Sequence, residues 1–190
     1  MATLRYLSHP EVMVDPAVPV PDWGLSDVGR RRTTELADRA SWLPSVTRIV
    51  TSGERKAIEA GEILAARVGL EVEQRPSTDE IDRSSTGYLS HDEHEAQANR
   101  LFAEPEVSAN GWERAIDAQA RVVRGLADLL AGDETVVVVG HGGVGTLLWC
   151  HLADRPIARE HDQPFGGHLY AVDLSTGRPD GPWRPFEDGA

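Results

Sequence analysis

A threonine followed by four valines, residues 135–139, constrains the fold of this chain more than any other segment. β-Branched side chains favour extended backbone, and an unbroken apolar run is typical of a parallel strand that is covered on both faces. Parallel strands are joined by crossover connections, which are usually helices. The run therefore predicts an α/β protein in which helices cover both faces of a mostly parallel sheet.

Strand-like and helix-like segments alternate along the rest of the chain. Short apolar or alternating segments predict further strands at residues 4–7, 48–50, 71–73 and 169–174. Apolar residues at helical spacing, with caps at Ser26 and Gly69, predict helices over residues 27–40, 54–68, 111–130 and 145–152, and residues 91–103 can also be helical. This alternation predicts a doubly wound sheet, and we expect the Gly/Pro-rich tail from Gly177 to lie on the surface.

Composition limits the domain count and the possible partners. A length of 190 residues suits one hydrophobic core, so we predict one domain over residues 1–190. The formal net charge of −12 argues against binding to nucleic acid or to an acidic membrane surface, since both are polyanions. No apolar run approaches the roughly 20 residues that span a bilayer, no leader-like segment opens the sequence, and the single cysteine, Cys150, allows no internal disulfide. We expect a cytoplasmic protein.

Polar residues follow three of the predicted strands. Ser8-His9-Pro10-Glu11 follows the first strand, Thr51-Ser52-Gly53-Glu54-Arg55-Lys56 the second, and Gly140-His141-Gly142-Gly143 the valine-rich one. Ligands of open α/β sheets bind at the carboxyl ends of the parallel strands. The two histidines and the cationic helix start would therefore meet in one crevice, where helix N-termini favour an anion.

The glycines after the valine-rich strand have two other interpretations. Residues 140–145 match the Gly-x-Gly-x-x-Gly pattern of dinucleotide-binding proteins, but too little chain follows to complete the two mononucleotide-binding halves. The same segment resembles the Gly-x-Ser-x-Gly elbow of α/β-hydrolases, but Gly142 occupies the position of the nucleophile. Neither pattern explains the histidine after the first strand.

The order and spacing of these segments, from Leu4 to about Tyr170, resemble the histidine phosphatase superfamily, also called the phosphoglycerate mutase-like family. Ser8-His9-Pro10-Glu11 is similar to its first motif, which begins Arg-His-Gly, at the histidine and at the acidic residue, but the arginine and the glycine are missing. The other similar segments are the family's Leu-Thr-x-x-Gly at residues 25–29, its Ser-Ser-x-x-x-Arg-Ala helix start at residues 51–57 with Lys56 in place of arginine, its acid at Glu80, and its Ser-His-Gly-Gly at residues 140–143.

The resemblance implies a phosphatase that hydrolyses a small phosphomonoester without a cofactor or metal. His9 would attack phosphorus and form a phosphohistidine, and Glu80 would protonate the leaving oxygen and later activate water. His141 would help to neutralise the transferring group, which carries its charge on three equatorial oxygens. The phosphate-binding residues that the resemblance indicates are Ser8, Lys56, Arg83 and Gly142.

The first motif lacks the arginine of the family. A guanidinium holds phosphate through two parallel hydrogen bonds, whereas Ser8 offers one hydroxyl and Lys56 a point charge. Arg83 is the first candidate to replace the lost cation, Arg55 is the second, and Arg5 is a weaker one because it lies further back along the strand. The loss also motivates an alternative hypothesis, a catalytically weak member that binds a phosphorylated ligand or a protein partner as a regulator.

The acidic middle of the chain bears on specificity. Within the family, mutases hold a second phosphate with extra basic residues, and this segment offers few, so a mutase is the less favoured expectation. We expect a small cap inserted at about residues 82–114, with Trp112 and Glu113 helping to cover the site. The segment from Ser77 to Asn110 would then set the substrate, whose identity the sequence does not indicate, and the oligomeric state is equally open.

Overall fold

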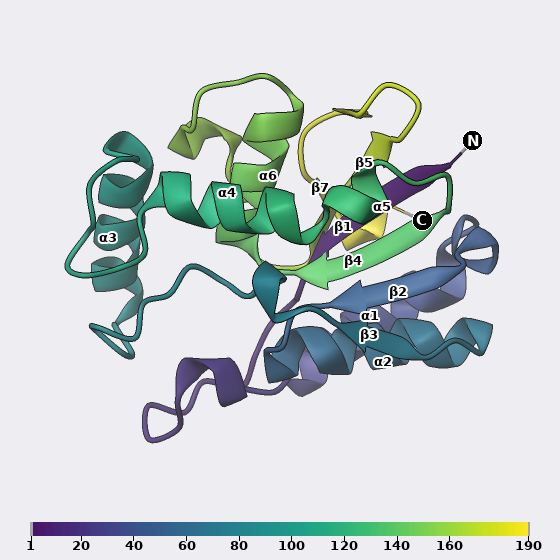
Figure 1. Cartoon of the computed structure of the whole chain (residues 1–190). Coiled ribbons are helices and arrows are strands. Elements are labelled where there is room, and N and C mark those ends of the chain that lie inside the picture. Colours follow the sequence, from purple (N-terminus) through teal and green to yellow (C-terminus); the bar gives the residue numbers. More distant parts are fainter. Residues whose placement is uncertain (1, 190) are drawn as a thin grey trace.

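The computed structural model describes residues 2–189, and within them one seven-stranded mixed sheet organises the chain (Figure 1). The sheet order is β3-β2-β4-β1-β5-β6, and β7 pairs with β5. Strands β3, β2, β4 and β1 run parallel, whereas β5 to β7 add antiparallel pairs at one edge. The strands are β1 (Thr3–Ser8), β2 (Arg48–Thr51), β3 (Val72–Gln74), β4 (Val136–Gly140), β5 (His168–Asp173), β6 (Arg178–Pro179) and β7 (Arg184–Pro185).

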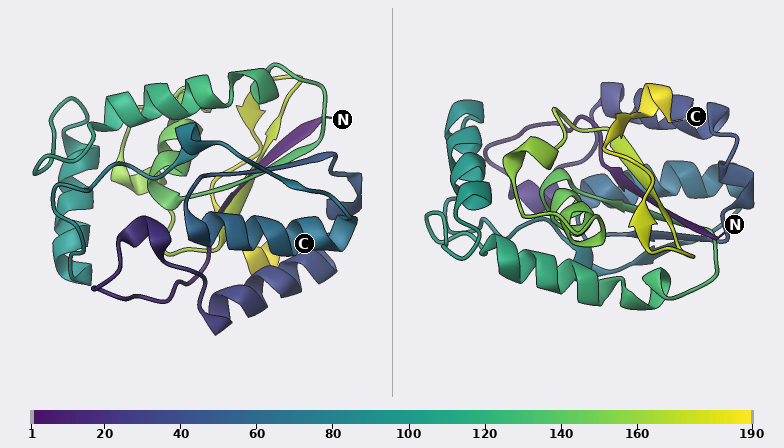
Figure 2. Two further views of the ribbon diagram at one scale, coloured as in Figure 1. Left: turned by 60° about the horizontal axis from the view of Figure 1, so that its bottom comes forward. Right: turned by 90° about the horizontal axis from the view of Figure 1, so that it is seen from above.

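Helices cover both faces of the sheet, which confirms the predicted fold class (Figure 2). The valines of β4 alternate between two hydrophobic cores. Val136 and Val138 pack in the core beneath α4, α5 and α6, and Val137 and Val139 pack in the core beneath α1 and α2. The helices are α1 (Asp27–Arg39), α2 (Arg55–Val68), α3 (His91–Ala103), α4 (Ala115–Gly125), α5 (Ala127–Leu130) and α6 (Gly142–Leu152).

The predicted helix boundaries are confirmed where a capping residue marks them. The Ser26 side chain accepts a hydrogen bond from the Gly29 amide at 3.1 Å and begins α1, and Gly69 ends α2 with a φ of 70°. The long helix predicted over residues 111–130 is wrong at both its start and its middle. Asn110 and Gly111 have φ values of 51° and 84°, and the helix begins only at α4 and is interrupted at Leu126 before α5.

The C-terminal tail lies mostly on the surface, as predicted, but two of its aromatic side chains are buried. Trp183 and Phe186 are buried, and the tail adds β6 and β7 to the sheet. Trp183 packs edge-on against Tyr6 and Tyr170, with ring centroids 5.9 and 4.8 Å away. Two aromatic side chains outweigh the Gly/Pro content of this segment, because their burial removes a large apolar area from water.

The predicted cap at residues 82–114 contains α3 between two loops, and α3 lies beyond the end of α4 in Figure 1. Leu101, Phe102 and Trp112 belong to the core under α4 and α6, so Trp112 serves packing rather than the site. The connections also contain short 3-10 helices, η1 (Val20–Asp22), η2 (Leu43–Ser45), η3 (Pro76–Thr78), η4 (Arg159–His161) and η5 (Phe186–Asp188). None of the helices in residues 2–189 is long and apolar enough to cross a membrane.

Candidate active site

The sheet brings His9 and His141 together. β1 pairs with β4 in a register that sets Ser8 beside Gly140, so the two histidines follow neighbouring strand ends. The His9 amide donates a hydrogen bond to the Gly140 carbonyl at 2.9 Å. The two rings meet edge to face with centroids 5.2 Å apart and an interplanar angle of 70°. The two histidines that the sequence predicts to share one crevice are therefore close together.

His9 has the form of a nucleophile. Its Nδ1 lies 2.8 Å from the Pro10 carbonyl oxygen, which can only accept, so Nδ1 carries the hydrogen and Nε2 keeps a lone pair. Burial, reinforced by the charge of Lys56, lowers the pKa of His9 to about 4. The ring is therefore neutral at neutral pH.

His141 is fully buried and has one nitrogen without a partner. Its Nε2 lies 2.7 Å from the Ser52 hydroxyl and 3.6 Å from a carboxylate oxygen of Glu54. Burial lowers the pKa of His141 well below 6.5, although the charge of Glu54 raises it. Nδ1 has no hydrogen-bond partner among residues 2–189. A buried polar atom without a partner is costly, so Nδ1 is suited to a ligand.

Glu54 is a site residue that the sequence analysis missed. Its carboxylate accepts hydrogen bonds from the Lys56 ammonium and from the Glu80 amide, the latter at 3.0 Å. Burial raises the pKa of Glu54, but its interactions with His141 and with the charge of Lys56 outweigh this and lower it to about 2. Lys56 also donates to the Val20 carbonyl at 2.8 Å, so the predicted phosphate-binding cation is tied into the protein. The position of Glu54 at the start of a predicted helix beside Lys56 was the available signal.

Glu80 is the second carboxyl of the site, and it caps the start of α6. Its oxygens accept hydrogen bonds from the amides of Gly143 at 3.1 Å and of Val144 and Ile81 at 3.0 Å. Burial raises the pKa of Glu80 above its ordinary value of 4.5, against the lowering effects of Arg83 and these amides. Environments that push two neighbouring carboxyls apart in pKa are typical of an acid paired with an ionised group. Of the two carboxyls, Glu80 keeps a proton to the higher pH, and Glu54 stays ionised.

Ser8 is buried, and its hydroxyl is held by the protein. The Ser8 oxygen accepts from the His168 amide at 3.1 Å, and its hydrogen is donated to Oε1 of Gln163 at 2.5 Å. This contact orients the Gln163 side chain so that its Nε2 lies close to Gly142. A β-carbon added to Gly142 would lie 2.3 Å from that nitrogen. Among the described residues nothing accepts a hydrogen bond from Nε2. Gln163 lies in the irregular segment after α6 and belongs to no motif, so no sequence signal pointed to it.

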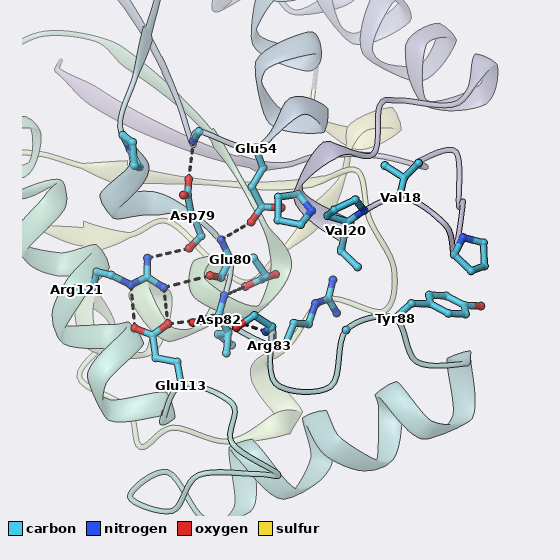
Figure 3. A pocket seen from close by; sticks show the side chains of 18 of the residues that line it. Val18, Val20, Glu54, Asp79, Glu80, Asp82, Arg83, Tyr88, Glu113 and Arg121 are labelled. Atoms are coloured by element: carbon cyan, nitrogen blue, oxygen red, sulfur yellow. Dashed lines mark hydrogen bonds and ion pairs between the residues drawn. The ribbon is translucent and has the colours of Figure 1, made fainter.

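Arg83 and Arg55, the first two candidates to replace the missing arginine, lie in different places. Arg83 lines a pocket of about 970 Å³ beside Glu54 and Glu80, and no carboxylate of residues 2–189 forms an ion pair with it. Figure 3 shows its side chain reaching into the middle of this pocket. Arg55 is exposed, is paired with Glu59 at 2.9 Å and does not line the pocket, so nothing directs this second candidate toward it. Arg5 lies over the ring of Trp42 at 4.7 Å and is also directed elsewhere.

Two comparisons with known proteins found relatives. A family model for the histidine phosphatase superfamily (branch 1) matches residues 17–179, a range that begins after His9. No relative was found among curated protein sequences.

The chain is also similar to solved structures that share its fold. One is a mycobacterial glucosyl-3-phosphoglycerate phosphatase in complex with inorganic phosphate, at 22% identity and a TM-score of 0.80, covering 98% of this chain and 99% of that one. Another is YhfR of Bacillus stearothermophilus, at 23% identity, a TM-score of 0.75, and coverage of 100% and 97%. A third is a phosphoserine phosphatase of Entamoeba histolytica in complex with 3-phosphoglyceric acid, at 16% identity, a TM-score of 0.75, and 94% coverage of both chains.

Proposed function

The chain belongs to the histidine phosphatase superfamily, and on this premise we propose that it is a phosphatase that hydrolyses a small phosphomonoester through a phosphohistidine on His9. The observation that carries the proposal is the pair of neutral imidazoles with centroids 5.2 Å apart. The Nε2 lone pair of His9 is free because Nδ1 is bound to the Pro10 carbonyl. A nucleophile of this kind divides a difficult hydrolysis into two easier transfers.

The phosphoryl group would be held by donors that the protein leaves free. Nδ1 of His141 is unpartnered, and Nε2 of Gln163 lies against the first residue of α6. The Gly142 amide is one of the first amides of α6, which have no acceptor within the helix. Ser8 acts indirectly in this proposal, by orienting Gln163.

Charge neutralisation would come from Arg83 more than from Lys56. Lys56 is buried against Glu54, which cancels most of its field at the phosphate. Arg83 lies in the pocket without an ion-pair partner among the described residues and can face the transferring oxygens with a guanidinium. Phosphoryl transfer depends mainly on positioning and on such electrostatic stabilisation.

Glu80 would serve as the acid and then as the base. In the first step a bond forms between His9 Nε2 and phosphorus, the ester P–O bond breaks, and Glu80 gives its proton to the leaving alcohol. In the second step water attacks phosphorus, Glu80 takes the proton, and the P–N bond breaks to release phosphate. Its raised pKa supports the first role, because the protonated form is present at higher pH than for an ordinary glutamate.

A steady-state assay with para-nitrophenyl phosphate tests the function. We expect turnover that is lost in His9→Ala and retained in the control variant His91→Ala, which changes an exposed histidine on α3. Equal turnover in the wild type and His9→Ala would refute the proposal. Binding of inorganic phosphate without any turnover would favour the alternative of a phospho-ligand-binding member.

A further inference from the structure

The pocket that Glu54, Glu80 and Arg83 line has one apolar wall. Residues 16–21, Pro-Ala-Val-Pro-Val-Pro, line it together with Tyr88. The segment is held in place, because the Trp23 indole donates to the Asp15 and Val18 carbonyls at 2.9 and 3.0 Å and Lys56 donates to Val20. In Figure 3, Val18, Val20 and Tyr88 lie on the same side of Arg83. This wall offers a pre-formed apolar surface to whatever group is esterified to the phosphate.

The opposite wall is acidic. Asp79, Asp82 and Glu113 lie there with Glu80, on the other side of Arg83 in Figure 3. Glu113 is paired with Arg121 at 2.7 Å, and the carbonyls of Ser77 and Asp79 hold the rest of that guanidinium at 3.0 and 2.9 Å. Asp79 and Asp82 have no cationic partner within residues 2–189; their hydrogen bonds come from the amides of Gly53 and Ser84.

The charge balance of the lining residues is therefore negative once the paired groups are set aside. Glu54 is cancelled by Lys56 and Glu113 by Arg121. Asp79 and Asp82 remain against Arg83, because Glu80 holds its proton before the first step, and the phosphate itself uses Arg83. A leaving group with a carboxylate or a second phosphate would find carboxylates and no free cation there, and like charges at close range are strongly unfavourable.

From these two walls we infer the substrate class, an inference that rests on the proposed function: the phosphomonoester of an apolar alcohol that carries no negative charge. An apolar body packs on residues 16–21, and a cationic group on that body faces Asp79 and Asp82. Phosphomonoesters whose alcohol carries a carboxylate are repelled by the same two aspartates. Asp79 and Asp82 are thus specificity-determining residues.

Three aryl phosphates that differ in the charge of the para substituent test the inference: phenyl phosphate, 4-carboxyphenyl phosphate and 4-(aminomethyl)phenyl phosphate. We expect kcat/KM for the carboxylated ester to be about tenfold below that of phenyl phosphate, and that of the cationic ester to equal or exceed it. The double variant Asp79→Asn/Asp82→Asn removes both charges but keeps the oxygens that accept hydrogen bonds from the backbone amides. It should reduce the difference in kcat/KM between phenyl phosphate and the carboxylated ester. The matched control Asp92→Asn, an exposed position on α3, should leave it unchanged.

The outcomes separate the two proposals. If the carboxylated ester is hydrolysed as well as phenyl phosphate, with turnover that still needs His9, the substrate class is wrong and the phosphatase function stands. If no ester is hydrolysed, the phosphatase function fails, and the binding of non-hydrolysable phosphonates then tests which ligand class the pocket accepts. In that case, calorimetry should show weaker binding of 4-carboxyphenylphosphonate than of phenylphosphonate, and equal or stronger binding would overturn the inference.

Discussion

At the scale of single residues, burial sets the protonation states. Burial keeps both imidazoles neutral, since it lowers the pKa of His9 to about 4 and that of His141 well below 6.5. The same burial raises the pKa of Glu80, while the ammonium of Lys56 keeps Glu54 ionised. The position of His9 and His141 at neighbouring strand ends could be predicted from the sequence, because each follows a recognisable strand directly. Glu54 and Gln163 could not be assigned roles, because those depend on contacts across the sheet and from a loop.

The pH profile of catalysis follows from these two groups. His9 must be neutral, so kcat/KM should fall as the pH drops through about 4. Glu80 must hold a proton, so kcat/KM should also fall as the pH rises through its raised pKa, which limits the optimum on the alkaline side. Measured from pH 3.5 to 8, Glu80→Gln should lower kcat by about 100-fold and flatten the alkaline limb. An alkaline limb that persists in this variant would assign the proton to another group.

Gln163 should contribute directly to phosphate affinity. Gln163→Glu keeps an acceptor for the Ser8 hydroxyl but replaces the free Nε2 donor with an anionic oxygen. We expect the inhibition constant of inorganic phosphate to rise about tenfold or more, because a charge-assisted hydrogen bond to the phosphate is lost. Gln119→Glu is a control on α4, because that side chain bonds only the Leu147 carbonyl. An inhibition constant unchanged in Gln163→Glu would contradict a phosphate contact.

At the scale of elements, helices and strands could be predicted where a capping residue or an apolar run marks them. The valines of β4, the Ser26 cap and Gly69 all led to correct elements. The helix predicted over residues 111–130 failed because apolar periodicity continues across Leu126, where the backbone breaks. Tertiary contacts also connect elements that are separate in sequence: Lys56 of α2 binds the carbonyl of Val20 in η1.

The Lys56–Glu54 pair should stabilise this junction of η1 with α2. Lys56→Met leaves the Glu54 carboxylate buried without its cation, and breaking one partner of a buried pair lowers the free energy of unfolding by about 3 kcal/mol. The double variant Glu54→Gln/Lys56→Met removes both charges and should recover most of that loss. Urea denaturation measures both changes. A double variant as unstable as Lys56→Met would show that lost packing, rather than the unpaired charge, is responsible.

At the scale of the whole molecule, the parallel sheet assembles the site from distant segments. The pairing of β1 with β4 joins the two histidines, the segment after α6 adds Gln163, and the loop after β3 adds Glu80 and Arg83. The sheet and the histidine pair were predictable, because the carboxyl ends of parallel strands share one edge. The pocket was not, since its walls come from a proline-rich segment and a cap loop that have no regular periodicity.

Trapping the covalent intermediate tests the central claim most directly. A phosphomonoester labelled with radioactive phosphorus is mixed with the protein, quenched in alkali within milliseconds, and digested. We predict acid-labile label on the peptide that contains His9, formed at up to one equivalent and discharged at the rate of turnover, and no label in His9→Ala. Turnover without label on that peptide, or label on another residue, would contradict the account.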